Sequence, residues 1–361
     1  MEEKKTINLL IKLQTFDSIF FEDATITEDT EITEITKFDC SYNNIKLLPI
    51  EIGNLTNLQK IFCVDNKIKS LPSEIGNLVN LRELYYSNNQ IKSLPNEITN
   101  LISLQKLDCS YNQIESLPSE IGNLVNLQKL QCDNNKIKLL PSEICNLTNL
   151  QMLNCDCNQL NSLPSEMSKL TNLQQLSCLY NQLNSLPSEI YKLTSLQQLY
   201  CSNNQLKSLS SEIGKLINLQ HLTCSDNQLN SLPSEIGNLT NLQVLYCHNN
   251  QLKSLPSEIG NLINLQKLYC YNNQLKLLPN EIGKLTSLQQ LYCDHNQLNS
   301  LPSQICNLNN LQILHYSNNE IEHIPPNVMR LIQRLENVNH NAQNIYKDKQ
   351  NIHNHSGGVR L

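Results

Sequence analysis

Residues 104–126 read LQKLDCSYNQIESLPSEIGNLVN, and this 23-residue stretch recurs along most of the chain. An asparagine stands at the same place in thirteen copies, from Asn43 to Asn319, which follow one another without an insertion. Cysteine precedes that asparagine by three positions in eleven copies, so the unit reads LxxLxCxxNxLxxLPxEIxxLxx. A fixed period of this length predicts a stack of similar units rather than several separate globular cores.

Each unit contains two local patterns. In the first half, Leu107 and Cys109 stand two residues apart, which is the period of a strand with one buried face. In the second half, Ile121 and Leu124 follow Pro118 at a spacing of three, which suits a helical or 3₁₀ turn that starts at the proline. One unit cannot bury its apolar side alone, so we expect parallel strands on one side, turns on the other and a shared core between them.

The composition narrows the classes of function. The chain has 361 residues, a formal net charge of −6 and no tryptophan. This charge is opposite to the one that nucleic acids and anionic membranes attract, so we expect neither as a partner. The apolar run at residues 7–11 is too short to cross a bilayer and lacks the positive flank of a signal peptide. We therefore expect a soluble, cytoplasmic protein.

The pattern resembles the leucine-rich repeat family over about residues 35 to 335. The 23-residue period and the segment 71–78, LPSEIGNL, are similar to the intracellular Ras-group subclass found in scaffold proteins such as Scribble and Erbin, although cysteine here replaces the usual aliphatic residue. The composition, rich in Asn, Ile and Lys, also resembles that of leucine-rich repeat proteins of large DNA viruses. For such a protein the compartment would be the host cytoplasm. The resemblance implies an α/β repeat solenoid, a horseshoe with a concave parallel β-sheet and short helical or 3₁₀ turns on the convex side.

We predict three parts of the chain. Residues 1–34 form an N-terminal cap, with a short helix over residues 7–13 and a degenerate repeat. Residues 35–335 form thirteen repeats with a closing helix, and residues 336–361 form a flexible polar tail. All phenylalanines lie in roughly the first sixth of the chain, where we expect them to cover the open end of the core, because terminal repeats need a different outer face. They are Phe16, Phe20, Phe21, Phe38 and Phe62.

Two recurring positions are predicted to be structural. A buried asparagine can donate two hydrogen bonds and accept two, so a column of them can join the backbones of adjacent repeats. This column includes Asn112, Asn135, Asn158, Asn181 and Asn204. Cysteine is expected to act as a small buried hydrophobe in a reducing compartment, because cysteines on adjacent strands are about 4.8 Å apart, too far for an unstrained disulfide. This second column includes Cys109, Cys132, Cys178 and Cys201.

The sequence offers little for catalysis. No nucleophile stands beside a dedicated base, and no glycine-rich phosphate loop occurs. His248, His295 and His315 belong to different repeats, which spreads them too widely for a metal site, and a straight cysteine column offers too few ligands for zinc. Cys157 immediately precedes Asn158 and should face solvent. We expect no catalytic residue, metal site or cofactor.

The exposed face of the sheet remains as the candidate site. The N-terminal copies carry a mixed-charge surface that should stay solvated, with Lys37, Lys60, Lys106 and Lys129 beside Asp39, Asp108 and Asp133. The C-terminal copies carry rigid rings with one polar tip, which are typical of binding hot spots, although tyrosine also simply covers strands well. The predicted partner-binding residues are Tyr200, Tyr246, His248, Tyr269, Tyr271, Tyr292 and Asp294.

These observations favour a monomeric, non-catalytic interaction module that holds an unknown protein or extended peptide on the concave face. The Ras-group resemblance suggests small GTPases or their regulators as candidates. The alternative is an adaptor or effector acting on ubiquitin ligation or small-GTPase signalling. Ubiquitin-ligation proteins normally carry a second domain, for which residues 1–34 and 337–361 are too short. A third hypothesis is a structural or decoy product with no dedicated ligand.

Overall fold

The computed structural model describes residues 34–336, and these form two compact units, residues 34–227 and residues 228–336. The cap predicted for residues 1–34 and the tail predicted for residues 336–361 lie outside the described residues except for Glu34 and Glu336, and Glu336 belongs to a helix rather than to the tail. Phe16, Phe20 and Phe21 also lie outside the described residues.

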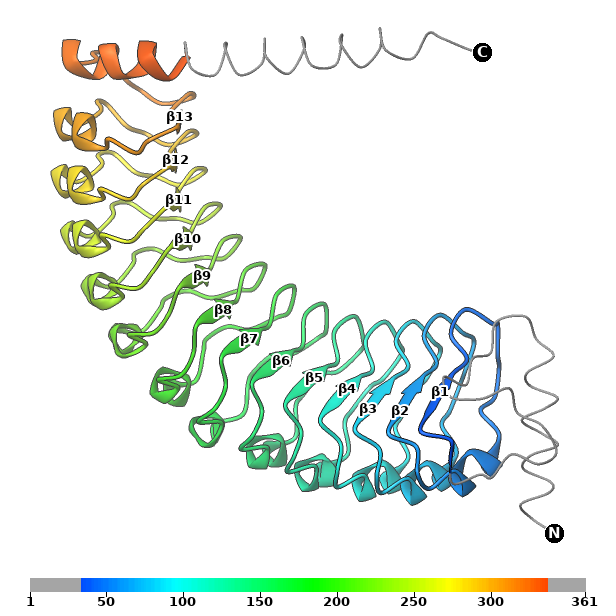
Figure 1. Cartoon of the computed structure of the whole chain (residues 1–361). Helices are drawn as coiled ribbons and strands as arrows, with labels where there is room; N and C mark the ends of the chain where they lie inside the picture. The colour runs from blue at the N-terminus through cyan, green and yellow to red at the C-terminus, as the bar shows by residue number, and fades with distance from the viewer. Residues whose placement is uncertain (1–33, 337–361) are drawn as a thin grey trace, which may run out of the picture. The chain divides into compact units, whose positions relative to one another are not determined.

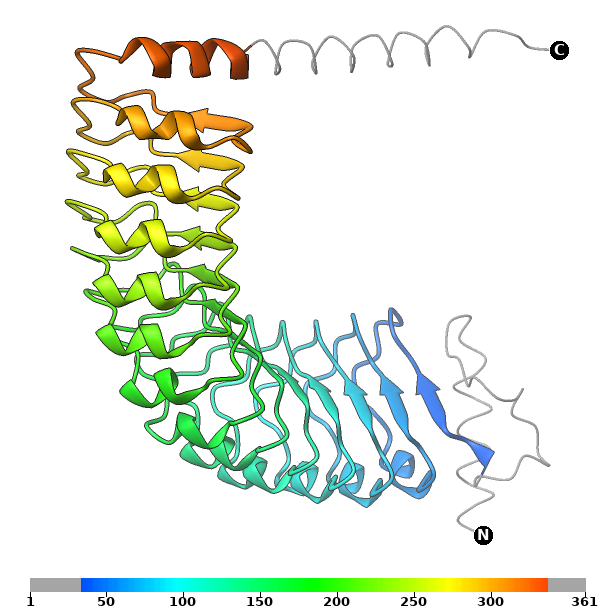
Figure 2. The ribbon, with the colours of Figure 1, turned by 60° about the vertical axis from the view of Figure 1, so that its left-hand side comes forward.

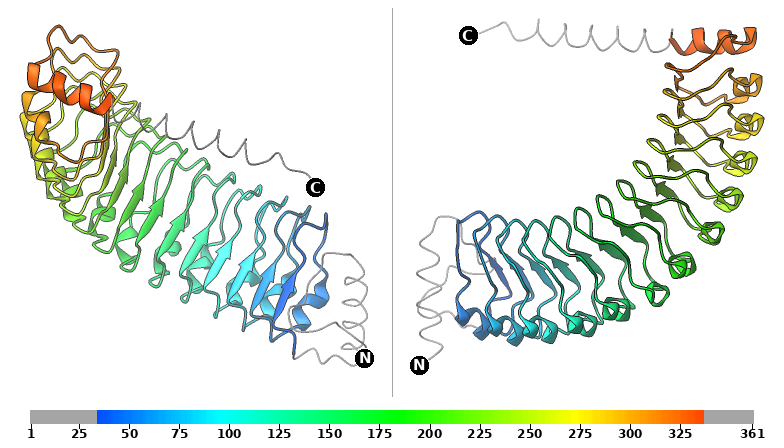
Figure 3. Two further views of the ribbon diagram at one scale, coloured as in Figure 1. Left: turned by 45° about the horizontal axis from the view of Figure 1, so that its top comes forward. Right: turned by 180° about the vertical axis from the view of Figure 1, so that it is seen from behind.

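The first unit contains a parallel sheet in which strand order follows chain order (Figure 1). Each strand pairs in register with the next at an offset of one repeat, so that Lys106 lies opposite Lys129. The strands are β1 (Lys37–Asp39), β2 (Lys60–Phe62), β3 (Glu83–Tyr85), β4 (Lys106–Asp108), β5 (Lys129–Gln131), β6 (Met152–Asn154), β7 (Gln175–Ser177), β8 (Gln198–Tyr200) and β9 (His221–Thr223). The stack curves with its strands on the inner side, as the view from behind also shows (Figure 3).

Short 3₁₀ helices form the outer side of the first unit. They are η2 (Ile50–Asn54), η3 (Ser73–Asn77), η4 (Asn96–Asn100), η5 (Ser119–Asn123), η6 (Ser142–Asn146), η7 (Met167–Lys169), η8 (Ser188–Lys192) and η9 (Ser211–Lys215). The residue before most of them is an extended proline, whose fixed φ suits this entry. Ser210 replaces that proline before η9, and its hydroxyl accepts a hydrogen bond from the Glu212 N–H at 3.2 Å. A serine cap thus substitutes for the missing proline.

The second unit repeats this arrangement and ends in a longer helix (Figure 2). Its parallel strands are β10 (Val244–Tyr246), β11 (Lys267–Tyr269), β12 (Gln290–Tyr292) and β13 (Ile313–His315). Its 3₁₀ helices are η10 (Ser234–Asn238), η11 (Ser257–Asn261), η12 (Asn280–Lys284) and η13 (Ser303–Asn307). Residues 326–336 are helical and bury Val328, Leu331, Ile332 and Leu335 at the end of the stack, the region for which a closing helix is predicted.

The core of each unit consists of columns of leucine, isoleucine and cysteine that are almost fully buried. The middle residue of each strand from β1 to β12 points into this core, while the residues on either side of it are at least partly exposed in most strands. The predicted solenoid of parallel strands and 3₁₀ turns is therefore confirmed in both units.

Glycine near the end of a 3₁₀ helix allows neighbouring turns to pack closely. A Cβ atom added at Gly76 would lie 2.5 Å from the carbonyl oxygen of Glu97 in the next repeat. No described glycine has a positive φ, so close approach rather than backbone conformation explains glycine here. Thr99 and Cys145 occupy the same position in other repeats.

The column of buried asparagines joins adjacent repeats through hydrogen bonds. Asn181 Nδ2 donates to the carbonyls of Cys155 at 3.0 Å, Cys178 at 3.3 Å and Leu179 at 3.0 Å. Its Oδ1 accepts from the N–H of Leu160 at 2.9 Å. Asn112, Asn135, Asn158 and Asn204 make the same set of bonds. Backbone groups left unpaired where the strands end therefore find side-chain partners.

A second, exposed asparagine ladder runs along the turns and was missed by the sequence analysis. In each case Nδ2 donates to the carbonyl oxygen 24 residues earlier, as Asn172 does to Thr148 at 2.8 Å. The other members in the first unit are Asn80, Asn126, Asn149 and Asn218. Asn264 and Asn310 are members in the second unit. Their recurrence nine residues before the buried asparagine is the signal that would have revealed them.

All fourteen cysteines are free thiols. Those of the buried column have raised pKa values because burial disfavours the thiolate, and the pKa of Cys224 rises to about 12. Cys157 is partly buried in a turn with a φ of 50°. Burial and the nearby Asp156 and Asp133 raise its pKa as well, which disfavours a reactive thiolate at neutral pH.

Candidate functional site

Aromatic side chains gather on the sheet face of the second unit that points away from the core. Strand register places Tyr246 beside Tyr269, Tyr269 beside Tyr292, and Tyr292 beside His315. His248 and Tyr271 lie two residues after Tyr246 and Tyr269, respectively, and form a second row. We call these six rings the aromatic patch.

The rings of the patch contact one another across the strands. Tyr246 and Tyr269 stack with centroids 4.3 Å apart and planes 13° apart, and Tyr292 and His315 stack at 4.5 Å and 12°. Tyr269 and Tyr292 join these two pairs in a tilted contact at 4.5 Å. In the second row, His248 and Tyr271 stack at 4.3 Å. Because stacking between strands covers the ring faces, the patch presents ring edges and hydroxyl groups outward.

The two rows also contact each other. His248 lies 6.1 Å from Tyr246 and 6.4 Å from Tyr269, measured between ring centroids, and both contacts are tilted. Such tilted arrangements match the positive edge of one ring to the negative face of another. The patch is therefore one continuous cluster that spans four adjacent strands, β10 to β13.

Two hydroxyl groups of the patch, those of Tyr269 and Tyr292, have raised pKa values. Burial, together with the neighbouring Tyr246, raises the pKa of Tyr269 to about 12, and the Tyr269 hydroxyl donates to Gln290 Oε1 at 2.5 Å. Burial, Tyr269 and Asp294 raise the pKa of Tyr292. Tyr269 and Tyr292 therefore offer neutral hydroxyl groups rather than phenolates.

Asp294 lies beside the aromatic patch and has spare hydrogen-bonding capacity. Its Oδ2 accepts from His295 Nδ1 at 2.8 Å, and His295 Nε2 faces the amide nitrogen of Asn318 at 2.7 Å. Its Oδ1 is buried and has no hydrogen-bond partner among residues 34–336. A buried carboxylate oxygen without a donor is costly. Because this oxygen is closed to solvent, a ligand would approach the carboxylate from its partly exposed side.

Tyr200 is the one predicted partner-binding residue that belongs to the first unit. It is half-buried on β8, between Ser177 of β7 and Thr223 of β9, and its hydroxyl donates to Gln198 Oε1 at 3.0 Å. The stacked cluster does not include it.

The charged surface of the first unit is only partly the solvated face that was predicted. Lys60 and Lys106 flank Glu83 with N–O distances of 3.9 and 3.2 Å. Asp133, however, is buried, and it accepts hydrogen bonds from Asn134 and Asn154. Burial raises its pKa, so the expectation of a solvated side chain was wrong for this residue. Neighbouring amide groups replace water as its partners.

The prediction that all phenylalanines cover the core was also wrong for Phe62. Phe38 is buried in the core, but Phe62 lies on the sheet face of β2 and stacks on Tyr85 of β3 at 5.0 Å. Lys37 Nζ lies 5.4 Å from the Phe62 ring centroid. Phe62 stands four residues before the asparagine, an outward position, and this register takes precedence over its hydrophobicity.

The described residues contain neither a cluster of three or more His, Cys, Asp or Glu side chains able to hold a metal ion nor a helix long and apolar enough to cross a bilayer. The histidines at positions 248, 295 and 315 are placed by ring stacking and hydrogen bonds instead.

Comparison with known proteins gives a consistent result. A family model described as a leucine-rich repeat region matches residues 38–112, 107–201 and 201–300. No curated protein matches the chain.

Several solved structures are similar to this chain. A leucine-rich repeat protein of Leptospira interrogans is 37% identical, with a TM-score of 0.77 and coverage of 84% of this chain and 82% of that one. The plant peptide hormone receptor RGFR1, in complex with RGF2, is 31% identical with a TM-score of 0.74. That match covers 82% of this chain and 50% of the receptor chain. An internalin, InlF, from Listeria monocytogenes is 26% identical, with a TM-score of 0.73 and coverage of 90% of both chains.

Proposed function

Because the chain belongs to the leucine-rich repeat family, we propose that it is a non-catalytic module that binds a protein or extended peptide on the exposed face of its sheet. The aromatic patch carries this proposal, since six contacting rings lie on a face that the core does not need. Ordered rings lose little entropy on binding, which makes them effective anchors. The similar plant receptor, solved with RGF2, supports a peptide as one class of partner.

The surroundings of the patch define the chemistry of the partner. Ring edges and hydroxyls suit a polar peptide backbone or side-chain amides, and the partly exposed carboxylate of Asp294 suits a cationic or amide donor. We therefore propose a partner segment that brings an amide, lysine or arginine group to Asp294. Its apolar side chains would cover the rings beside that contact.

The proposed setting is the cytoplasm, or the host cytoplasm if the viral resemblance holds, with the protein acting as a monomer. The fourteen free cysteines support a reducing compartment. The Ras-group resemblance makes small GTPases and their regulators the first partners to test. An adaptor role in ubiquitin ligation is the competing hypothesis.

The experiment is affinity capture: the full chain and three variants serve in parallel as baits for proteins in an extract of the native cell type. Proteins retained by the wild-type chain should be lost with Tyr269→Ala and kept with Lys60→Ala, a matched change on the sheet face of the first unit. For a captured partner, we expect at least one tyrosine-to-alanine change in the patch to weaken binding by about 2 kcal/mol. Tyr269→Phe separates the ring from its hydroxyl.

The outcomes distinguish the sheet face of the second unit, which carries the aromatic patch, from the sheet face of the first unit. Equal binding by the Tyr269→Ala and wild-type chains, with loss confined to Lys60→Ala, would reject the patch as the site. Circular dichroism of each variant checks that the sheet is retained, since Tyr269 lies outside the buried columns.

A further inference from the structure

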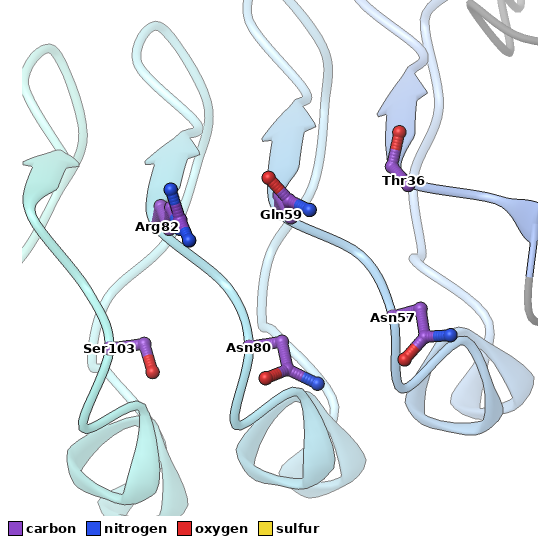
Figure 4. A pocket seen from close by; sticks show the side chains of 6 residues that line it. All are labelled: Thr36, Asn57, Gln59, Asn80, Arg82 and Ser103. Atoms are coloured by element: carbon purple, nitrogen blue, oxygen red, sulfur yellow. The ribbon is translucent and has the colours of Figure 1, made fainter.

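A second candidate site lies in the first unit, where a pocket of about 330 Å³ opens between two rows of polar side chains. Thr36, Gln59 and Arg82 form the row at the start of the strands, and Asn57, Asn80 and Ser103 form the row nearer the 3₁₀ helices (Figure 4). The volume is at the lower end of the range of small-ligand pockets, large enough for a side chain with its flanking peptide groups.

The pocket occurs where the repeat departs from its usual residues. The position of Arg82 is glutamine in every other repeat except the first, which has Thr36. The position of Ser103 is asparagine in most repeats, including Asn80 and Asn126 on either side. Ser103 makes no hydrogen bond with the other described residues, so the outer asparagine ladder is interrupted at this point. A longer, charged side chain and a shorter, neutral one thus meet in adjacent repeats.

Arg82 carries a charge that no other described group balances. Its side chain makes no ion pair or hydrogen bond with the rest of residues 34–336, and it is exposed. The nearby carboxylate of Glu83 is instead held by Lys60 and Lys106, and it accepts a hydrogen bond from the Tyr85 hydroxyl at 3.3 Å. The pocket therefore combines one free guanidinium with neutral hydroxyl and amide groups.

We propose that this pocket binds a carboxylate-bearing side chain of a peptide. The planar guanidinium of Arg82 suits a carboxylate because it can donate two parallel hydrogen bonds. A singly charged carboxylate matches the single positive charge of the lining, whereas a phosphate dianion would have one charge unbalanced. The Ser103 hydroxyl and the Gln59 side-chain amide then bond to the peptide groups beside the acidic residue. This site is independent of the aromatic patch, and either proposal can fail without the other.

Nuclear magnetic resonance of the full chain tests the proposal, because the chain has only four arginines: Arg82, Arg330, Arg334 and Arg360. The Nε–H signal of Arg82 is assigned by its loss in Arg82→Gln, a change to the residue that this position has in other repeats. The probe is N-acetyl-glutamate amide, compared with N-acetyl-glutamine amide and inorganic phosphate. We expect the glutamate probe to shift the Arg82 signal saturably and to leave Arg330 and Arg334 unchanged.

Backbone amide signals of Asn80 and Ser103 report binding in the variants. Arg82→Gln should weaken binding of the glutamate probe at least about tenfold, the usual effect of losing a hydrogen bond to a charged group. The control is the double variant Arg82→Gln/Gln151→Arg, which keeps the total charge but moves it to a repeat with Asn172 in place of Ser103. We expect it not to restore binding.

Three results would overturn the proposal. Equal binding of the glutamate and glutamine probes would show that the charge is not recognised. Tighter binding of phosphate would assign the pocket to a different anion. Full recovery in the charge-moved double variant would show that any arginine on this surface suffices.

Discussion

Replacing Asn181 by alanine tests whether the buried asparagines hold the repeats together. The change removes all four hydrogen bonds of this side chain, but the affected backbone groups do not suffer equally. The three carbonyls keep a second donor each: Asn158 Nδ2 for Cys155, Asn204 Nδ2 for Cys178 and the N–H of Cys157 for Leu179. The N–H of Leu160 loses its acceptor in a buried environment.

The expected loss of stability follows from that one group. A buried donor left without a partner costs roughly 1 to 3 kcal/mol, so we expect Asn181→Ala to lower the free energy of unfolding by about 2 kcal/mol. Asn172→Ala is the matched control, because its single bond to Thr148 is exposed and water can replace it. We expect a loss of about 0.5 kcal/mol or less for the control.

Urea unfolding of both variants, followed by circular dichroism, measures the difference. Because long repeat arrays can unfold in stages, amide hydrogen exchange at Leu160 provides a local readout. Exchange at Leu160 should accelerate in Asn181→Ala beyond what global destabilisation explains. Equal unfolding midpoints for the two variants, with unchanged exchange at Leu160, would refute the reasoning.

Further predictions concern the turns and the thiols. Gly76→Ala should destabilise the protein by about 1 to 3 kcal/mol in thermal or urea unfolding, because the new methyl group would meet the backbone of Glu97, whereas Cys145→Ala at the equivalent position should cost less. Thiol reagents at pH 8 should modify the partly exposed Cys157 before the buried column, and mass spectrometry of the labelled chain would identify the order. The contribution of the buried thiols to the free energy of unfolding should be fully present below about pH 8.5 and should fall as pH rises further, because the unfolded chain releases thiol protons that the folded column retains. Cys201→Ala should reduce that slope by about 1.4 kcal/mol per pH unit, and an unchanged slope in unfolding measured at several pH values would contradict the raised pKa.

The 23-residue period contained enough information to predict the fold. It specified strand and turn in each unit, and it distinguished inward from outward positions without any long-range contact, because each unit packs against near-copies of itself. The same register applied consistently would have placed Phe62 on the sheet face. The error at this residue came from treating hydrophobicity as stronger evidence than register.

The candidate sites depended more on the tertiary structure. The sequence indicated which rings point outward, but the stacking of Tyr246 on Tyr269 and the tilt between Tyr269 and Tyr292 depend on side-chain rotamers that the period does not determine. Burial of Asp133 likewise depends on amide groups from its neighbours.

The sequence by itself determined the repeat, its strands and turns, and the side of the sheet on which each residue lies, because these follow from local spacing. Only the tertiary structure revealed which neighbours meet across repeats. Arg82 and Ser103 are 21 residues apart and each departs from the usual residue of its position, but only the structure shows that they line one pocket, because stacking offsets each unit by a single strand spacing. Periodicity specifies the average unit, whereas binding sites arise where adjacent units differ from that average.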